Sequence, residues 1–247
     1  MPKQNHYTIE IIYNKEYQLK EDNKRYGSID LGINNLATLT SNVCQSVLYN
    51  GRPLKAINQY YNKHKGYLQS ELKGNKKTSK RIQRLTYRRN NKIKDYLHKI
   101  SNAIIQYMES NQLNTLFVGK NTGWKDSINI GKVNNQNFVS IPYNMLIQML
   151  EYKCKLHGIR VLTVNEAYTS KCSFLDNETI CKHDNYKGTR KTRGLFVSEQ
   201  GIKINADING SYNIMRLGLK QLNVTLDVLE IKPENQRFVL NPVSISI

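Results

Sequence analysis

The chain has 247 residues, enough for one large domain or two small ones with a core that needs no disulfide bonds. It carries 37 Lys and Arg residues against 19 Asp and Glu, a formal net charge of +18, and 39% of its residues are hydrophobic. No apolar run is long enough to cross a membrane and the N-terminus has no apolar segment, so we expect neither a membrane protein nor a secreted one. The four scattered cysteines indicate a cytoplasmic protein, and its positive charge favours a nucleic-acid partner, which suggests association with the nucleoid.

The first predicted elements are strands. His6 to Tyr13 alternates apolar and polar residues, and a charged loop follows over residues 15–25. Tyr26 to Gly32 is an apolar strand that ends at a turn. Two further strands, Leu36–Thr40 and Val43–Tyr49, complete a meander.

Positive charge is concentrated between Arg52 and Ile100, a segment that contains 15 Lys and Arg residues and only two acids. Two helices are predicted here, Lys55–Leu72 and Ser79–Ser110, separated by a polar break that begins at Gly74. On the second helix, apolar residues at helical spacing form one face, and an adjacent arc carries Arg81, Arg84, Arg88, Lys92 and Lys99. With tyrosines among the charges, this pattern is typical of a surface that follows phosphates and stacks bases, and the alternative is a solvated helical hairpin.

Strands and helices alternate in the rest of the chain. The predicted elements are a buried strand Thr115–Gly119, a polar loop over 120–140, a helix Ile141–His157, a strand Ile159–Val164, a basic turn-rich region over 167–204, a helix Ala206–Leu217 and a weakly alternating tail from Val224 to Ile247. The order of three strands, helices, strand, helix, strand, helix predicts an α/β core with a mixed sheet and an inserted basic helical hairpin, in the manner of the RNase H fold.

Two acids occupy positions where metal chemistry is plausible. Asp30 ends the first core strand, and Asp207 opens the last helix. Taken singly, Asp30 is a turn residue and Asp207 a helix N-cap. Taken together, carboxylates at neighbouring element ends can hold divalent ions for in-line attack on a phosphodiester, and magnesium prefers such oxygen ligands.

Several ordered motifs resemble one family. Ile29 to Ala37, with the sequence IDLGINNLA, resembles the first RuvC motif of the TnpB family, the OrfB-type proteins of insertion sequences related to type V CRISPR effectors. Similar segments follow in the family's order: Val118–Lys125 in the second-motif region, Asn134–Phe138, Tyr168–Ser173, Asn205–Ile214 as the third RuvC motif, and the terminal Asn241–Val243.

The resemblance implies an RNase H-like (RuvC) core and an RNA-guided DNA endonuclease that uses magnesium or manganese. Asp30 and Asp207 would be metal ligands of its triad, and its partners would be DNA and a transposon-encoded guide RNA. Two alternatives stay open: a nuclease-dead RNA-guided DNA-binding protein, such as a repressor, and a truncated inactive remnant. The residues expected to contact nucleic acid are Lys76, Lys77, Arg81, Arg84, Arg88, Arg89, Lys92, Lys120, Trp124, Lys125, Arg190 and Arg193.

The third carboxylate departs from the family pattern. Most members have a catalytic Glu directly after the strand that ends here at Val118, where this chain has Gly119 and then Lys120. The nearest substitute is Glu166, beyond the next core strand. In an RNase H-like order that strand lies two spacings from the strand of Asp30, about 9.5 Å, a gap that inward side chains can bridge through metal ions. We therefore predict that Glu166 is a relocated third ligand. The alternative is that Glu166 is a loop residue and that the site is inactive.

The zinc ribbon of the family is also altered. In place of two Cys-x-x-Cys pairs, the region offers Cys172, Cys181 and His183, whose spacing matches no recognised zinc motif. We expect a metal-free basic loop, and a three-ligand zinc site completed from elsewhere is the alternative.

The chain is short for the family, whose members carry a large N-terminal wedge and recognition region. His6–Tyr13 resembles the last strand of that region. Three alternatives stay open: a natural truncation, a fragment with a missing N-terminal region, and a minimal variant that relies on RNA or on a partner chain. The resemblance divides the chain into a residual wedge strand and linker (1–25), RuvC-like core parts (26–53 and 111–166), the basic hairpin (54–110), a degenerate basic loop at the zinc-ribbon position (167–204), and the last core part with the tail (205–247).

Overall fold

The computed structural model describes residues 2–3, 6–7, 9–120, 140–229 and 240–246. Its centre is a six-stranded mixed sheet in the order β11-β5-β4-β3-β6-β7. The strands are β3 (Tyr26–Leu31), β4 (Asn35–Ser41), β5 (Val47–Asn50), β6 (Thr115–Gly119), β7 (Arg160–Val164) and β11 (Val243–Ile245). The α/β fold class with a mixed sheet is therefore confirmed, as are the meander and the two later core strands.

The strand that carries Asp30 is central. β3 pairs antiparallel with β4 and parallel with β6, and β6 pairs parallel with β7. Parallel neighbours need a crossover, which α4 (Tyr143–Leu156) supplies between β6 and β7. The carboxyl ends of β3, β6 and β7 therefore meet at one edge of the sheet.

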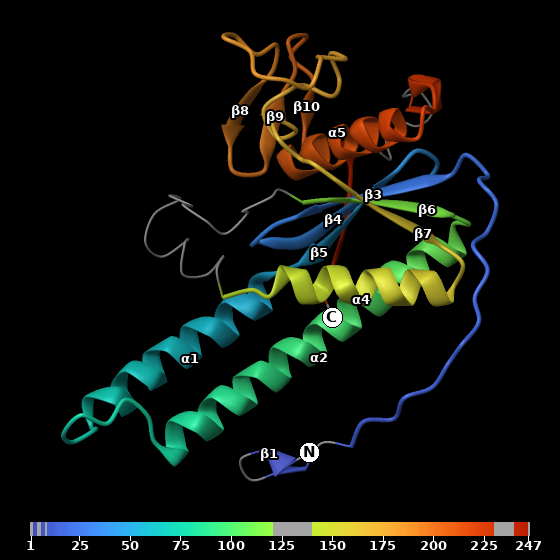
Figure 1. Cartoon of the computed structure of the whole chain (residues 1–247). Coiled ribbons are helices and arrows are strands. Elements are labelled where there is room, and N and C mark those ends of the chain that lie inside the picture. The colour runs from blue at the N-terminus through green and yellow to red at the C-terminus, as the bar shows by residue number, and fades with distance from the viewer. Residues whose placement is uncertain (1, 4–5, 8, 121–139, 230–239, 247) are drawn as a thin grey trace.

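Helices cover both faces of the sheet. α5 (Ala206–Gln221) lies across one face, and α4 with the C-terminal half of α2 (Lys80–Ser110) lies across the other (Figure 1). Two apolar clusters fill these interfaces, one of them dominated by residues of α2 and α4 and the other by residues of α5. The result is a three-layer arrangement that leaves the ends of the strands accessible.

The basic hairpin projects from this core. α1 (Arg52–Ser70) and α2 pack side by side and extend away from the sheet (Figure 1). The Ser79 hydroxyl accepts a hydrogen bond from the Ile82 amide and begins α2 at the predicted residue. The apolar face is buried as the 3.6-residue period predicts, at Ile82, Ile93, Leu97, Ile100 and Ile104.

The turn-rich region contains structure that the sequence did not indicate. A small antiparallel sheet, β8 (Thr189–Thr192), β9 (Leu195–Val197) and β10 (Lys203–Ile204), packs beside the N-terminal end of α5 (Figure 1). A 3-10 turn, η1 (Leu226–Leu229), follows α5. The strands of the small sheet are only two to four residues long, so they show too little alternation to be predicted from the sequence.

The N-terminal strand prediction is wrong in extent. Only Pro2–Lys3 (β1) and His6–Tyr7 (β2) pair with each other, and residues 9–24 form no helix or strand. Ile9, Ile11 and Ile12 are 83–92% exposed. The alternating pattern is real, but a strand needs a neighbouring edge, and the described residues offer none to this segment.

None of the helices within the described ranges has the length and apolar character needed to cross a membrane.

Candidate metal-binding carboxylate site

A cavity of about 410 Å³ opens at the carboxyl edge of β3 and contains all three predicted acids. It is lined by residues of the β3–β4 turn, the segment after β7, the β8–β9 hairpin and the start of α5, among them Asp30, Asn35, Glu166, Tyr168, Arg190 and Asp207. Segments separated by more than 170 positions in the sequence thus contribute to one site.

Asp30 reaches the cavity from the end of β3 and lies against α5. A Cβ atom on Gly210 would stand 2.8 Å from Asp30 Oδ2, so the carboxylate fits only because position 210 has no side chain. Burial raises the pKa of Asp30 well above its ordinary value, and the neighbouring charges of Glu166 and Asp207 raise it further, while Arg190 lowers it. The Asp30 carboxylate therefore lies within electrostatic range of the other two acids.

Asp207 is not the helix cap that a single acid at a helix start suggests. Asn205 caps α5, because its side-chain oxygen accepts from the amides of Asp207 and Ile208. The Asp207 carboxylate is therefore available to the cavity. There its Oδ2 accepts from Asn35 Nδ2 at 2.9 Å and its Oδ1 accepts from Arg190 Nη2 at 3.2 Å.

Glu166 occupies the space above Gly119. β6 and β7 pair with Gly119 opposite Val164, and Glu166 follows two residues later. A Cβ atom on Gly119 would stand 2.5 Å from Glu166 Oε2 and 2.5 Å from Ile214 Cδ1. Burial raises the pKa of Glu166 to about 7. The carboxyl group thus lies where a side chain at position 119 would begin.

The donor set suits a hard divalent ion, because carboxylate oxygens are the ligands that magnesium and manganese prefer. Within the described part of the chain, however, no group of three or more His, Cys, Asp or Glu side chains is close enough to hold one ion as it stands. Asp207 instead contacts the Arg190 guanidinium at 3.2 Å. Binding of one ion by all three acids therefore requires side-chain movement.

A buried hydroxyl cluster fixes α5 on the sheet directly below the acids. Ser28, Thr40 and Ser211 are fully buried, and their hydroxyl oxygens lie within 2.7–3.1 Å of one another. Ser211 also donates to the carbonyl of Ser28 or Thr38, at 3.0 and 3.1 Å. The cluster sets the position of α5 relative to β3, and with it the position of Asp207 relative to Asp30.

Two buried asparagines of α5 hold the segment that follows Glu166. Asn213 Nδ2 donates to the carbonyls of Thr169 and Cys172 at 2.9 and 2.8 Å. Asn209 Nδ2 donates to the Cys172 carbonyl and its Oδ1 accepts from the Phe174 amide, both at 2.9 Å. These asparagines and Asn35 were not predicted as site residues. The repeated Asn in the third motif was a signal, since buried amides must find partners.

Apart from Arg89, the predicted nucleic-acid contacts fall into three groups. Lys76, Lys77, Arg81, Arg84, Arg88, Lys92 and Lys120 are exposed, all but Lys120 on the hairpin. Arg190 and Arg193 line the carboxylate cavity. Trp124 and Lys125 lie outside the described residues.

Arg89 differs from the other hairpin cations. Its guanidinium donates to Asn58 Oδ1 through two nitrogens, at 2.9 and 2.7 Å, and to the Ser140 carbonyl at 2.7 Å. It also lies over the Tyr61 ring, 5.4 Å from the centroid, and burial lowers its pKa. Arg89 therefore joins α1 to α2 and to the start of the α4 segment, which leaves less of it for a ligand.

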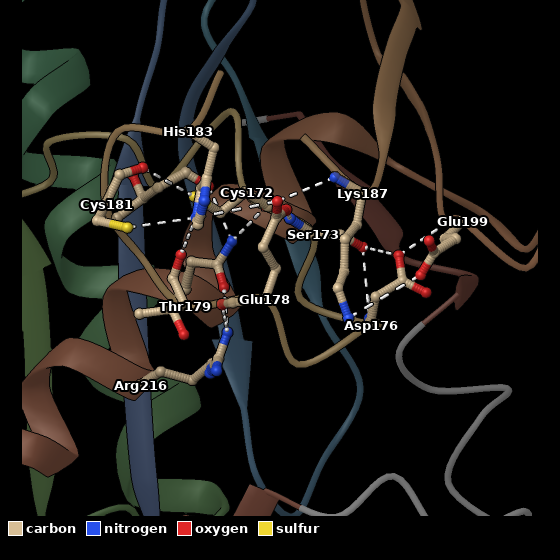
Figure 2. A network of polar contacts seen from close by, with 12 residues as sticks. Cys172, Ser173, Asp176, Glu178, Thr179, Cys181, His183, Lys187, Glu199 and Arg216 are labelled. Atoms are coloured by element: carbon tan, nitrogen blue, oxygen red, sulfur yellow. Dashed lines mark hydrogen bonds and ion pairs between the residues drawn. The ribbon is translucent and has the colours of Figure 1, made fainter. Parts of the chain in front are cut away.

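The loop at the zinc-ribbon position is organised around a buried carboxylate (Figure 2). Glu178 is 4% exposed, its Oε2 accepts from the Ser173 amide at 2.7 Å, and its Oε1 accepts from the Lys187 amide at 2.9 Å. Arg216 of α5 donates to the Glu178 carbonyl at 2.8 Å. These bonds tie the loop to itself and to α5.

The weak zinc candidates lie beside this carboxylate (Figure 2). Cys172 donates to the Cys181 carbonyl at 3.6 Å, and Cys181 Sγ lies 3.3 Å from His183 Nε2. His183 Nε2 lies 4.0 Å from Glu178 Oε1. The expectation of a loop without zinc stays a prediction.

The chain is similar to known proteins over most of its length. The OrfB_IS605 family model, described as a probable transposase, matches residues 8–125, and the model of the Cas12f1-like TNB domain matches residues 143–214. A TnpB-like protein of Acidianus two-tailed virus is 24% identical over 208 residues, which are 80% of this chain and 42% of the viral protein.

Solved structures share the fold. A Cas12f1–sgRNA–target DNA complex matches with a TM-score of 0.61 and 20% identity, over 79% of this chain and 50% of that chain. The mini-RNA-guided endonuclease Cas_phi3 matches with a TM-score of 0.51 and 13% identity, over 79% of this chain and 45% of that one. The chain thus spans about half the length of the proteins it matches, and the RNase H-like fold is what these structures establish for it.

Proposed function

The chain belongs to the TnpB family, and from that premise we propose that it is an RNA-guided DNA endonuclease whose metal-dependent site consists of Asp30, Glu166 and Asp207. The observation that carries the proposal is the placement of the Glu166 carboxyl over Gly119, in one cavity with the two motif aspartates. The space of the family's usual glutamate is thereby filled by a carboxylate from the segment that follows the next strand, β7.

Each acid has a distinct environment for this task. Burial raises the pKa values of Asp30 and Glu166, so a nearby positive charge would stabilise the ionised form of both carboxylates. Asp207 is oriented by Asn35, a neutral donor that can stay in place when the carboxylate turns toward an ion. Magnesium or manganese bound by these residues would activate a water and stabilise charge on the phosphate.

Arginines beside the acids supply the contacts that a phosphodiester needs. Arg190 and Arg193 line the same cavity, and Arg190 reaches Asp207 at 3.2 Å. A guanidinium released from Asp207 can bind phosphate oxygens through two donors. The exposed cations of the hairpin would bind further phosphates of the same nucleic acid. The partners in this proposal are DNA and a guide RNA. The chain would be divided into the six segments given in the sequence analysis.

The test is cleavage of a labelled DNA duplex by the full chain with its copurified RNA, in magnesium and in EDTA. We expect magnesium-dependent cleavage that Glu166→Gln slows on the order of 100-fold or more, because a metal ligand is lost. Glu151→Gln, at an exposed position of α4, is the matched control and should cleave like the parent. Unchanged cleavage by the Glu166 variant would remove this residue from the mechanism.

A second candidate function, RNA-guided DNA binding without cleavage, is favoured by the contact of Asp207 with Arg190 and by the lack, among described residues, of a closed three-ligand group. Manganese binding measured by calorimetry separates the two. If the protein is a nuclease, it should bind manganese, and Glu166→Gln should weaken that binding. If the site is inactive, Glu166→Gln should leave the manganese affinity unchanged, and DNA binding should not depend on the metal.

A further inference from the structure

A strained aromatic residue stands at the rim of the carboxylate cavity. Tyr168 has a φ of +66°, in the left-handed region that bulky residues avoid. Of the five described non-glycine residues with positive φ, the others are Lys24, Gln112, Asn177 and Asn223, so Tyr168 is the aromatic one. Conformations of this kind persist where surrounding contacts enforce them, and they cluster at functional sites.

The surrounding contacts do enforce this turn. The Thr169 amide and hydroxyl both donate to the Glu166 carbonyl, at 3.2 and 2.8 Å. The amides of Lys171 and Cys172 donate to the Tyr168 carbonyl, at 3.0 and 3.1 Å. Asn213 then fixes the Thr169 carbonyl from the fully buried side. The backbone of Tyr168 is therefore anchored on both sides.

The side chain on this rigid turn is presented to solvent and to the cavity. Tyr168 is 39% exposed and lines the cavity together with Glu166, Arg190 and Arg193. Across the residues that the structure describes, its ring makes neither an aromatic nor a cation–π contact. A packing role would give the ring partners, and an exposed ring without ring partners is free to receive a ligand.

We propose that Tyr168 is a stacking platform for a nucleobase of the strand whose phosphate lies at the carboxylates. The inference rests on the proposed function, and it adds a base subsite to a site so far described by its phosphate and metal contacts. A base presents a π-face to a tyrosine ring whatever its identity, so this contact would position the strand without reading its sequence. Guanidinium groups nearby bind the backbone of the same strand.

The experiment uses the full chain and short single-stranded DNA oligonucleotides that each carry 2-aminopurine at a different position, in EDTA so that nothing is cleaved. Stacking on a ring quenches this fluorophore. We expect quenching at one position with the parent and with Tyr168→Phe. Tyr168→Ala should lose the quenching and bind about 5- to 100-fold more weakly. Tyr152→Ala, at a 46% exposed tyrosine of α4, is the matched control and should behave like the parent.

A further variant separates stacking from folding. Asn tolerates the left-handed region, so Tyr168→Asn should unfold at a higher temperature than Tyr168→Ala and still lack the quenching. Binding and quenching by Tyr168→Ala that equal those of the parent would overturn the stacking role and leave the proposed function standing. A parent that binds no oligonucleotide at any salt concentration would overturn the proposed function and the stacking role together.

Discussion

Two residues without side chains shape the carboxylate site as much as its acids do. Gly210 makes room for Asp30 against α5, and Gly119 makes room for Glu166 against Ile214. In both cases a Cβ atom would stand less than 3 Å from a carboxylate oxygen. These glycines are required by close approach rather than by backbone conformation.

Gly119→Ala should therefore destabilise the protein by about 1–3 kcal/mol, because the new methyl group overlaps Glu166 and Ile214. Gly66→Ala, on α1, is the matched control. Its Cβ atom would have no neighbour within 4 Å. Alanine stabilises a helix by about 0.5–1 kcal/mol relative to glycine, so the free energy of unfolding should rise. Urea denaturation gives the free energy of unfolding of both variants and of the parent. Equal stability of Gly119→Ala and the parent would mean that Glu166 is not held over position 119.

The raised pKa of Glu166 makes stability depend on pH in a defined direction. The folded state holds this proton up to about pH 7, while the unfolded chain releases it near 4.5. The group's contribution to stability is thus fully present below pH 4.5 and is lost as the pH rises through 7. In EDTA, the parent should lose about 2–3 kcal/mol more than Glu166→Gln between pH 4.5 and 8.

Asp30, whose pKa is also raised, is present in both proteins. The difference between their pH dependences of stability therefore reports the ionisation of Glu166 and the effect of its charge on Asp30. Denaturant titrations at several pH values give the comparison. Parallel pH profiles of the two proteins would show that Glu166 ionises in the fold as it does in the unfolded chain.

At the scale of elements, the helical hairpin combines a rigid interior with a charged exterior. The 31-residue α2 buries its apolar face on the sheet and on α1, and Arg89 and Tyr61 connect the two helices through Asn58 and Thr86. Arg81, Arg84, Arg88 and Lys92 are exposed on the outside of the hairpin. A rigid and charged arm of this kind is suited to following a phosphate backbone.

Replacement of Arg81, Arg84, Arg88 and Lys92 by Gln should weaken duplex binding most at low salt. If each neutralises one phosphate, the slope of log K against log salt should become shallower by about 3–4. Arg89→Gln is the contrasting variant. It should change the slope little and lower the unfolding temperature, because it removes the bonds to Asn58 and Ser140. An unchanged slope for the fourfold variant would show that the hairpin is not the binding surface.

At the scale of the whole molecule, the sheet is closed at one edge by the C-terminal tail. β11 pairs parallel with β5, and the Val243 amide donates to the Ser46 carbonyl at 3.0 Å. Gln45 and Asn50 add side-chain bonds to the tail, at 2.9 and 3.0 Å. The tail therefore covers an edge that would otherwise expose unpaired backbone groups.

Val243→Pro should lower stability by about 1–3 kcal/mol and promote aggregation, because proline removes the amide that bonds to Ser46. Ser244→Pro is the matched control, since successive amides of a strand point to opposite sides and that of Ser244 faces away from β5. Thermal unfolding and light scattering report the two effects. Equal behaviour of both variants would show that pairing with β5 contributes little.

The elements that could be predicted from the sequence are those whose information is local. The apolar period of α2, its Ser79 cap and the short apolar runs of β3, β6 and β7 each depend on neighbours a few positions away, so a pattern reveals them. The ordered motifs likewise pointed to Asp30 and Asp207, and the expected strand order pointed to Glu166 as the candidate third acid. Where local pattern needed a distant partner, as in residues 6–13, the prediction overran the strand.

The way in which distant segments meet became visible in the folded chain alone. The placement of Glu166 over Gly119, the contacts of Asp207 with Asn35 and Arg190, the structural use of Arg89 and the pairing of β11 with β5 all join residues that lie far apart in the chain. Such contacts depend on the packing of whole elements and on the room left by a missing side chain, and neither quantity is encoded in the spacing of residue types along the chain.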